Sequence, residues 1–158
     1  MDSSDWNQVS NIYKEGIETG MATFETIVPS YERWDGSHLK NCRFVAIYNN
    51  EIAGWAALSA VSGRHVYRGV AEVSVYIGKE YRGLGIGKAL MQHLILESEK
   101  EGYWTLQSGI FPTNTPSINL HEKVGFRKIG YRERVAQLHD VWIDNVLFER
   151  RSKVIGTE

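Results

Sequence analysis

Cysteine is nearly absent from this sequence of 158 residues, in which Cys42 is the only one. A single cysteine cannot form a disulfide within the chain, and it makes a thiolate metal cluster implausible. Metal-ligand spacing such as His-x-x-x-His is missing as well, so we predict that the protein holds no metal. The histidines are scattered along the chain at His38, His65, His93, His121 and His139.

An excess of positive charge is also missing, because 18 Lys and Arg face 19 Asp and Glu, for a net charge of −1. Binding to a nucleic-acid backbone needs clustered Lys and Arg. The composition therefore argues against a nucleic-acid partner, including an aminoacyl-tRNA substrate. A local basic patch can still bind a small anionic cofactor.

Long hydrophobic runs are absent too. No apolar run approaches the roughly 20 residues that a membrane span requires, and the polar residues 1–4 are unlike a signal peptide. We therefore expect a cytoplasmic protein with no membrane partner. The length suits a single domain over residues 1–158, with a frayed tail from about residue 151, because the chain is too short for two ordinary cores.

The stretch around which the rest of the chain is organised covers residues 71–96. Its first part alternates with the period of two that is typical of a strand. Ala71, Val73, Val75 and Ile77 fall on one face, and Glu72, Ser74 and Tyr76 fall on the other. An amphipathic helix at 85–100 is expected to follow.

A glycine-rich turn, residues 82–87, joins this strand to the helix. Its backbone N–H groups lie at the positive end of the helix, which favours an anion such as phosphate. A Walker A loop would need Gly at Arg82 and Ser or Thr at Ala89, and a dinucleotide fingerprint would need Gly at Lys88 or Leu90. Both motifs are excluded. The alternative that the glycines only let the strand turn into a helix stays open.

Before this stretch, Asp5 and Gln8 form a predicted capping box that opens a first helix ending near Gly20. Residues 21–30 are read either as a loop over the site or as a surface connection. A short helical turn at 31–34 should follow, and then a hairpin of strands 44–48 and 52–58.

After the central helix, residues 104–110 alternate as another strand. Thr115 is expected to cap the next helix, which carries Pro116 in its first turn and ends near Gly125. Two further strands are predicted at 126–135 and 141–149.

The Arg82-x-x-Gly85-x-Gly87 turn resembles the pyrophosphate loop of the GNAT superfamily of N-acetyltransferases. The order of predicted elements also resembles the GNAT fold, an α+β layered fold whose central, mixed but mostly antiparallel sheet is flanked by helices. That fold usually opens with a strand, and since few residues precede Asp5, this strand should be short or absent. A closer resemblance, to the phosphinothricin and methionine sulfoximine N-acetyltransferase group, rests on residues 22–26, 54–58, 66–76, 109–112, 114, 121 and 142–146.

This resemblance implies that acetyl-CoA is the cosubstrate and that the acceptor is the α-amine of a small amino-acid-like molecule. Glu72 and His121 match the proposed catalytic bases of the group. If Glu72 is enclosed, its pKa should rise toward the useful range; a carboxylate paired with an Arg is the alternative. A His at position 121 can accept or donate a proton near neutral pH, and an ordinary helix-surface His is the alternative. A backbone N–H near Val75 should stabilise the oxyanion.

The same match implies the binding residues. Phe24 should line the substrate pocket, and Arg64, Tyr67 or Arg68 should meet a carboxylate or phosphinate, which suits an Arg fork. The group is typically homodimeric, and Trp142 is either an interface residue or ordinary core. The expected cofactor contacts are Val75, Ile77, Arg82, Gly83, Leu84, Gly85, Gly87, Lys88, Asn114 and Ser117.

Two other functions stay open from the sequence. A protein N-terminal or lysine acetyltransferase would prefer peptides to free amino acids. A non-catalytic acyl-CoA-binding sensor would bind acetyl-CoA and release no thiol with any amine.

Overall fold

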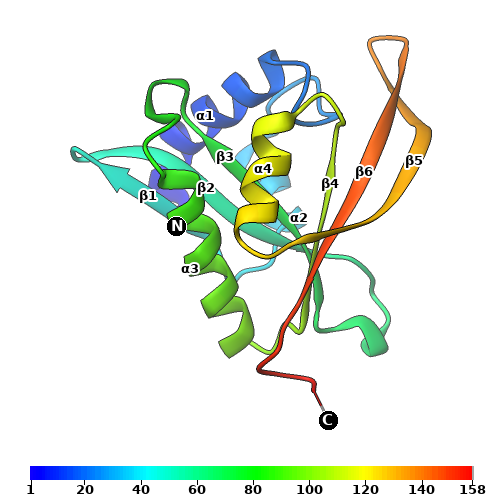
Figure 1. The fold of residues 1–158 in the computed structure, drawn as a ribbon. Coiled ribbons are helices and arrows are strands. Elements are labelled where there is room, and N and C mark those ends of the chain that lie inside the picture. Colours follow the sequence, from blue (N-terminus) through cyan, green and yellow to red (C-terminus); the bar gives the residue numbers. More distant parts are fainter. Residues whose placement is uncertain (158) are drawn as a thin grey trace.

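The computed structural model, which describes residues 1–157, shows a six-stranded sheet flanked by amphipathic helices (Figure 1). The strand order is β1-β2-β3-β4-β6-β5, and every neighbouring pair is antiparallel except β3 and β4. The predicted mixed, mostly antiparallel sheet is therefore confirmed. The strands are β1 (Phe44–Tyr48), β2 (Glu51–Ala60), β3 (Val70–Ile77), β4 (Thr105–Ile110), β5 (Arg127–Leu138) and β6 (Val141–Arg151).

Helices cover both faces of the sheet, because β2 carries buried apolar side chains on each side. On one face, α3 packs against Ala56 and Leu58, and on the other, α1 and α2 pack against Trp55 and Ala57. In Figure 1, α3 and α4 lie together on the first of these faces. The helices are α1 (Trp6–Glu18), α2 (Tyr31–Ser37), α3 (Ile86–Lys100) and α4 (Thr115–Lys123), with 3-10 turns η1 (Ser3–Asp5), η2 (His65–Tyr67) and η3 (Lys79–Tyr81).

The hairpin between β1 and β2 is confirmed. Its two turn residues, Asn49 and Asn50, adopt φ of 50° and 66°. Asn tolerates this left-handed conformation, which two-residue hairpin turns require.

The start of the chain differs from the prediction in one respect. The capping box joins Asp2 and Asp5, because the η1 turn precedes α1: the Asp2 side chain accepts from Ser4 N–H, and Asp5 accepts from Asp2 N–H (both 2.9 Å). Gln8 accepts instead from the Ile52 N–H (2.9 Å) and so ties α1 to β2. Within residues 1–157 no strand precedes α1.

The end of the chain is better ordered than predicted. Arg151 belongs to β6, and its guanidinium donates to the carbonyls of Trp104 (2.9 Å) and Ile155 (3.0 Å). Ser152 is 4% exposed and donates its N–H to the Trp104 carbonyl. These contacts contradict a frayed tail at residues 151 and 152, while residue 158 lies outside the described range. None of the described helices is long and apolar enough to cross a membrane.

Candidate functional site

A cleft opens where β3 and β4 part. The two parallel strands pair only from Val70 to Glu72, opposite Thr105 to Gln107. Beyond that point the β3 edge has no pairing with β4, and the gap widens into a cleft of about 1050 Å³. The cleft reaches from the α1 side of the sheet to the first turns of α3 and α4.

One end of the cleft is a cradle for an anion. Gly83 and Gly85 both adopt φ of 79°, which glycine reaches at no steric cost, and a Cβ at either would meet open space. Gly85 precedes the 15-residue helix α3, whose free N–H groups therefore face the cleft. Arg82 and Lys88 line the same end and add positive charge. This geometry supports the predicted phosphate site.

Nine of the ten predicted cofactor contacts line the cleft, and Leu84 does not. Its side chain is 53% exposed. The nine are Val75, Ile77, Arg82, Gly83, Gly85, Gly87, Lys88, Asn114 and Ser117.

Glu72 is the last residue of β3 that pairs with β4, and it lines the cleft. Its side chain is exposed rather than enclosed, and Oε2 accepts a hydrogen bond from Gln107 Nε2 (3.4 Å). No ion pair to Glu72 is found among residues 1–157, so pairing with an Arg does not explain this carboxylate. The carboxylate is therefore open to whatever enters the cleft.

His121 also lines the cleft and is only 1% exposed, which contradicts the helix-surface alternative. Its ring packs edge-on against Phe126, with centroids 5.0 Å apart. Nδ1 lies 2.8 Å from the Ser117 carbonyl oxygen, which can only accept, so Nδ1 carries the proton.

This tautomer leaves the lone pair of His121 on Nε2, which is buried and has no hydrogen-bond partner among the described residues. Burial lowers the pKa of His121, and the bond to the Ser117 carbonyl opposes this effect in part. The ring is therefore neutral at pH 7 and can accept a proton at Nε2.

The α1 side of the cleft is aromatic. Phe24 lines it as predicted and meets Phe111 edge-on at 4.6 Å. Tyr76 packs against Gly16 of α1 so closely that a Cβ there would lie 2.6 Å from its ring. Desolvation strongly raises the pKa of the Tyr76 hydroxyl, which stays protonated.

Sequence reasoning missed several lining residues. Tyr76 could have been found, because it shares the strand face of Glu72. Asn145 could not, because its place beside Gly109 depends on β6 pairing with β4. Ser108, Phe111 and Tyr13 also line the cleft.

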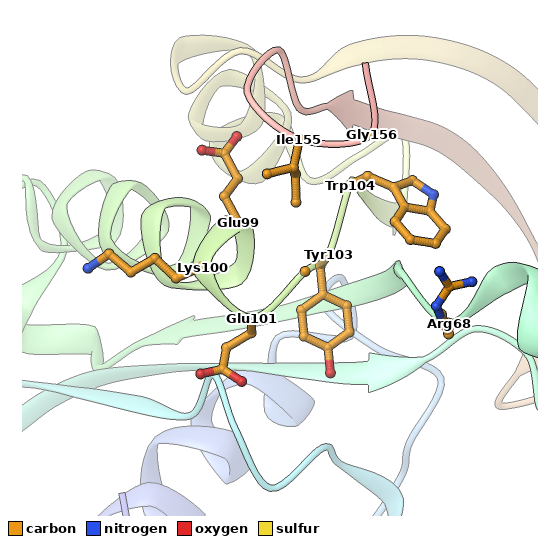
Figure 2. A pocket seen from close by; sticks show the side chains of 9 residues that line it. Arg68, Glu99, Lys100, Glu101, Tyr103, Trp104, Ile155 and Gly156 are labelled. Carbon is orange, nitrogen blue, oxygen red and sulfur yellow. The ribbon is translucent and has the colours of Figure 1, made fainter. Parts of the chain in front are cut away.

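Arg64, Tyr67 and Arg68 do not line the cleft, which corrects the prediction that they meet the substrate. They lie around η2, before β3 begins. Arg64 stacks over the Tyr67 ring (5.6 Å), and Arg68 stacks over Trp104 (5.2 Å). Figure 2 shows Arg68 beside Trp104 in a separate hollow, which Tyr103 and Glu101 also line.

No group of three or more His, Cys, Asp or Glu side chains in residues 1–157 is arranged to hold a metal ion. Two acidic residues, Glu25 and Glu72, line the cleft. The cations Arg82, Lys88 and Lys123 also line it. The cleft therefore offers positive charge at an anion cradle and proton acceptors beside it.

Comparisons with known proteins agree with this geometry. The model of the Acetyltransferase (GNAT) family matches residues 6–126. A phosphinothricin N-acetyltransferase from Alcaligenes faecalis is 30% identical over 152 residues, which are 90% of this chain and 75% of that protein. An L-methionine sulfoximine/L-methionine sulfone acetyltransferase from Pseudomonas aeruginosa is 33% identical over 94 residues, or 60% of this chain and 55% of that protein.

A solved structure shows the same fold. A GNAT superfamily phosphinothricin acetyltransferase from Sinorhizobium meliloti, in complex with acetyl-CoA, superposes with a TM-score of 0.86 at 29% identity. The match covers 96% of this chain and 85% of that one. Because the family model spans most of the chain and the predicted turn, strand order and fold coincide, the protein belongs to the GNAT family of acetyltransferases.

Proposed function

We propose that this enzyme transfers the acetyl group of acetyl-CoA to the α-amine of a small amino-acid-like substrate. The relatives named for phosphinothricin, methionine sulfoximine and methionine sulfone indicate the substrate class. The observation that carries the proposal is that one cleft joins the glycine cradle at α3 to two proton acceptors, Glu72 and His121.

The residues of the cleft fit acetyl-CoA. The open space above Gly83 and Gly85 and the free N–H groups of α3 suit a pyrophosphate. Arg82 and Lys88 would balance its charge. When bound, the cosubstrate supplies an acetyl thioester, and the unpaired edge of β3 near Val75 would hold the acyl end in the cleft that Glu72 also lines.

The chemistry needs a neutral amine, because an α-ammonium group has no lone pair for attack. Glu72 would accept the proton that the nitrogen loses as the carbon–nitrogen bond forms. When the carbon–sulfur bond then breaks, CoA would leave as a thiolate and take up one proton. A backbone N–H of β3 near Val75 would stabilise the oxyanion between these events. His121 would accept a hydrogen bond at Nε2, directly or through a water, and so serve as the second proton acceptor.

His121→Gln should lower kcat by about 10- to 100-fold, less than loss of the main base, because one of two proton acceptors is removed. The measurement is kcat/KM as a function of pH. A variant whose turnover and both limbs of the pH profile matched the wild type would remove His121 from the mechanism.

The pH dependence of protein stability provides a second measurement on His121→Gln. The pKa of His121 is lowered on folding, so between the folded and unfolded values the unfolded chain binds a proton that the folded chain does not. The free energy of unfolding should therefore fall as the pH drops below about 6.5. In His121→Gln this part of the pH dependence should vanish in urea titrations.

A thiol-release screen tests the proposed function. Acetyl-CoA is incubated with free amino acids, phosphinothricin, methionine sulfoximine and a panel of peptides. We expect release with the small amines. Release with peptides alone would favour a protein acetyltransferase, and acetyl-CoA binding in calorimetry without any release would favour a sensor.

We also propose that the enzyme is a homodimer whose contact includes the β5–β6 hairpin. Trp142 is 55% exposed, so it is not ordinary core, and Val141 beside it is 60% exposed. Trp142→Asp should turn a dimer into a monomer in sedimentation velocity, because a buried interface Trp is often worth about 2 kcal/mol or more. Leu96→Asp, at a site 58% exposed on α3, is the matched control. A wild-type monomer would contradict the proposal.

A further inference from the structure

Asn145 of β6 has a side-chain amide without a hydrogen-bond partner in residues 1–157. The residue is half-buried and lines the cleft. Its Oδ1 is buried, so Nδ2 is the end of the amide that reaches the cleft surface. The neighbouring Asp144, by contrast, accepts from the Tyr131 hydroxyl (2.5 Å) and the Arg134 N–H (2.7 Å). Buried polar groups in proteins nearly always have a partner, so we expect this amide to bind a ligand.

Gly109 on the neighbouring strand β4 makes room for the Asn145 amide. Gly109 pairs with Leu147, two residues from Asn145 along β6, so the two positions are diagonal neighbours. A Cβ at Gly109 would lie 2.9 Å from both Nδ2 and Oδ1 of Asn145. The amide therefore lies against the β4 backbone, in space that any side chain at position 109 would fill.

The amide lies on the face of the sheet opposite to α3 and α4. Val146 belongs to the core beneath these helices, and Asn145, one residue earlier in the strand, points the other way. Glu72 points the same way as Asn145, because the next residue, Val73, belongs to that same core. The amide therefore shares a sheet face with the proposed base, and the anion cradle at α3 is on the other face.

The spacing along β4 suits a single amino acid. Gln107 pairs with Glu72, and Gly109, next to the amide, is two residues farther along β4. A strand rises about 3.3 Å per residue, so the amide lies about 7 Å along the strand from the level of Glu72. In an extended amino acid, roughly 5 Å separates the α-nitrogen from the δ atom of the side chain. With its nitrogen beside Glu72, a substrate would bring an oxygen on that δ atom to the amide, whereas its α-carboxylate would stay near Glu72.

We propose that Asn145 is a specificity-determining residue, whose Nδ2 donates a hydrogen bond to an oxygen on the side chain of the amine substrate. The inference rests on the proposed function and narrows the substrate class to amino acids whose side chain carries an accepting oxygen at the δ position. The amide takes the role that the sequence assigned to Arg64, Tyr67 or Arg68, none of which lines the cleft. A neutral donor also requires no negative charge on the group that it binds.

Two substrates of similar shape isolate this hydrogen bond. L-methionine sulfone ends in a methylsulfonyl group, and L-2-amino-5,5-dimethylhexanoic acid has a tert-butyl group there, which accepts no hydrogen bond. The measured quantity is kcat/KM for the sulfone divided by kcat/KM for the tert-butyl compound. In Asn145→Leu this ratio should fall about three- to tenfold, the size of effect of one neutral hydrogen bond. KM for acetyl-CoA should stay unchanged.

A second variant, Asn145→Asp, keeps the shape of the side chain. It replaces the N–H donor with a carboxylate oxygen, which repels the sulfone oxygens, so the ratio should fall at least as far. Asn119→Leu is the matched control, because Asn119 lines the cleft from α4, and its ratio should equal that of the wild type. Each ratio compares two substrates on one protein, so a partial loss of folded enzyme cancels.

The inference can fail while the proposed function stands. An unchanged ratio in Asn145→Leu would overturn it, and so would equal losses of kcat/KM with both substrates, which would indicate a contact with the α-carboxylate. A rise in KM for acetyl-CoA of the same size as the loss would also overturn it, because the amide would then bind the cosubstrate. Absence of thiol release from the wild type with every amine would overturn the proposed function and this inference together.

Discussion

Glu72→Gln should reduce kcat by about 10²- to 10⁴-fold, because Gln keeps the shape of the side chain and cannot accept a proton. Acetyl-CoA affinity, measured by calorimetry, should be retained, since Glu72 is not among the expected cofactor contacts at Val75, Ile77 and the glycine turn. The bond to Gln107 Nε2 can be kept by the Gln carbonyl oxygen, so the fold should be little affected.

Glu25→Gln is the matched control, because Glu25 is the other acidic residue that lines the cleft. Its turnover should fall far less. Equal losses in the two variants would mean that negative charge in the cleft, and not a proton acceptor on β3, supports the reaction. Unchanged turnover in Glu72→Gln would remove Glu72 from the mechanism.

Gly85→Ala should weaken acetyl-CoA binding by about tenfold or more, the second large effect that the structure predicts. Gly85 adopts φ of 79°, and a left-handed Ala costs roughly 1–2 kcal/mol. The turn would relax away from this conformation and carry the first N–H groups of α3 with it.

Gly102→Ala provides the control at the other end of the same helix. Gly102 has φ of 88° and open space around its Cβ position, but it does not line the cleft. Both variants should lose similar stability in thermal melts, and only Gly85→Ala should bind acetyl-CoA more weakly in calorimetry. Equal affinities in the two variants would contradict the glycine cradle.

Local rules explain what the sequence predicted well. Alternation along β3 predicted the strand, and residues 72–77 of this strand, from both of its faces, line the cleft. The glycine-rich turn predicted both its own backbone conformation and the exposed N-terminal end of α3. These features depend on neighbours in the chain, so a pattern of a few residues suffices to predict them.

Features that depend on distant packing were missed or left open. The burial of His121 comes from Phe126 and Phe148, and the latter belongs to a strand that follows α4. Arg68 was expected in the cleft because of the family resemblance. Arg68 precedes β3, which begins at Val70, and its guanidinium stacks instead on Trp104.

The N-cap of α4 was also predicted wrongly from the sequence, although the two candidate residues are neighbours in the chain. Thr115 and Asn114 are both suitable residues for the start of α4, and the sequence alone favoured the one beside Pro116. The structure uses Asn114, whose longer side chain also reaches Met21 on another segment. A contact across 93 residues gives no local signal.

The central claim is that the cleft moves an acetyl group from acetyl-CoA to the nitrogen of a small amine. The most direct measurement is the ratio of free CoA thiol to N-acetylated product in one reaction of the wild-type enzyme with phosphinothricin or methionine sulfoximine, the product being identified by mass spectrometry. We predict one N-acetylated molecule for each thiol released. Thiol release without an N-acetylated product, or no release with any amine in the presence of bound acetyl-CoA, would contradict the claim.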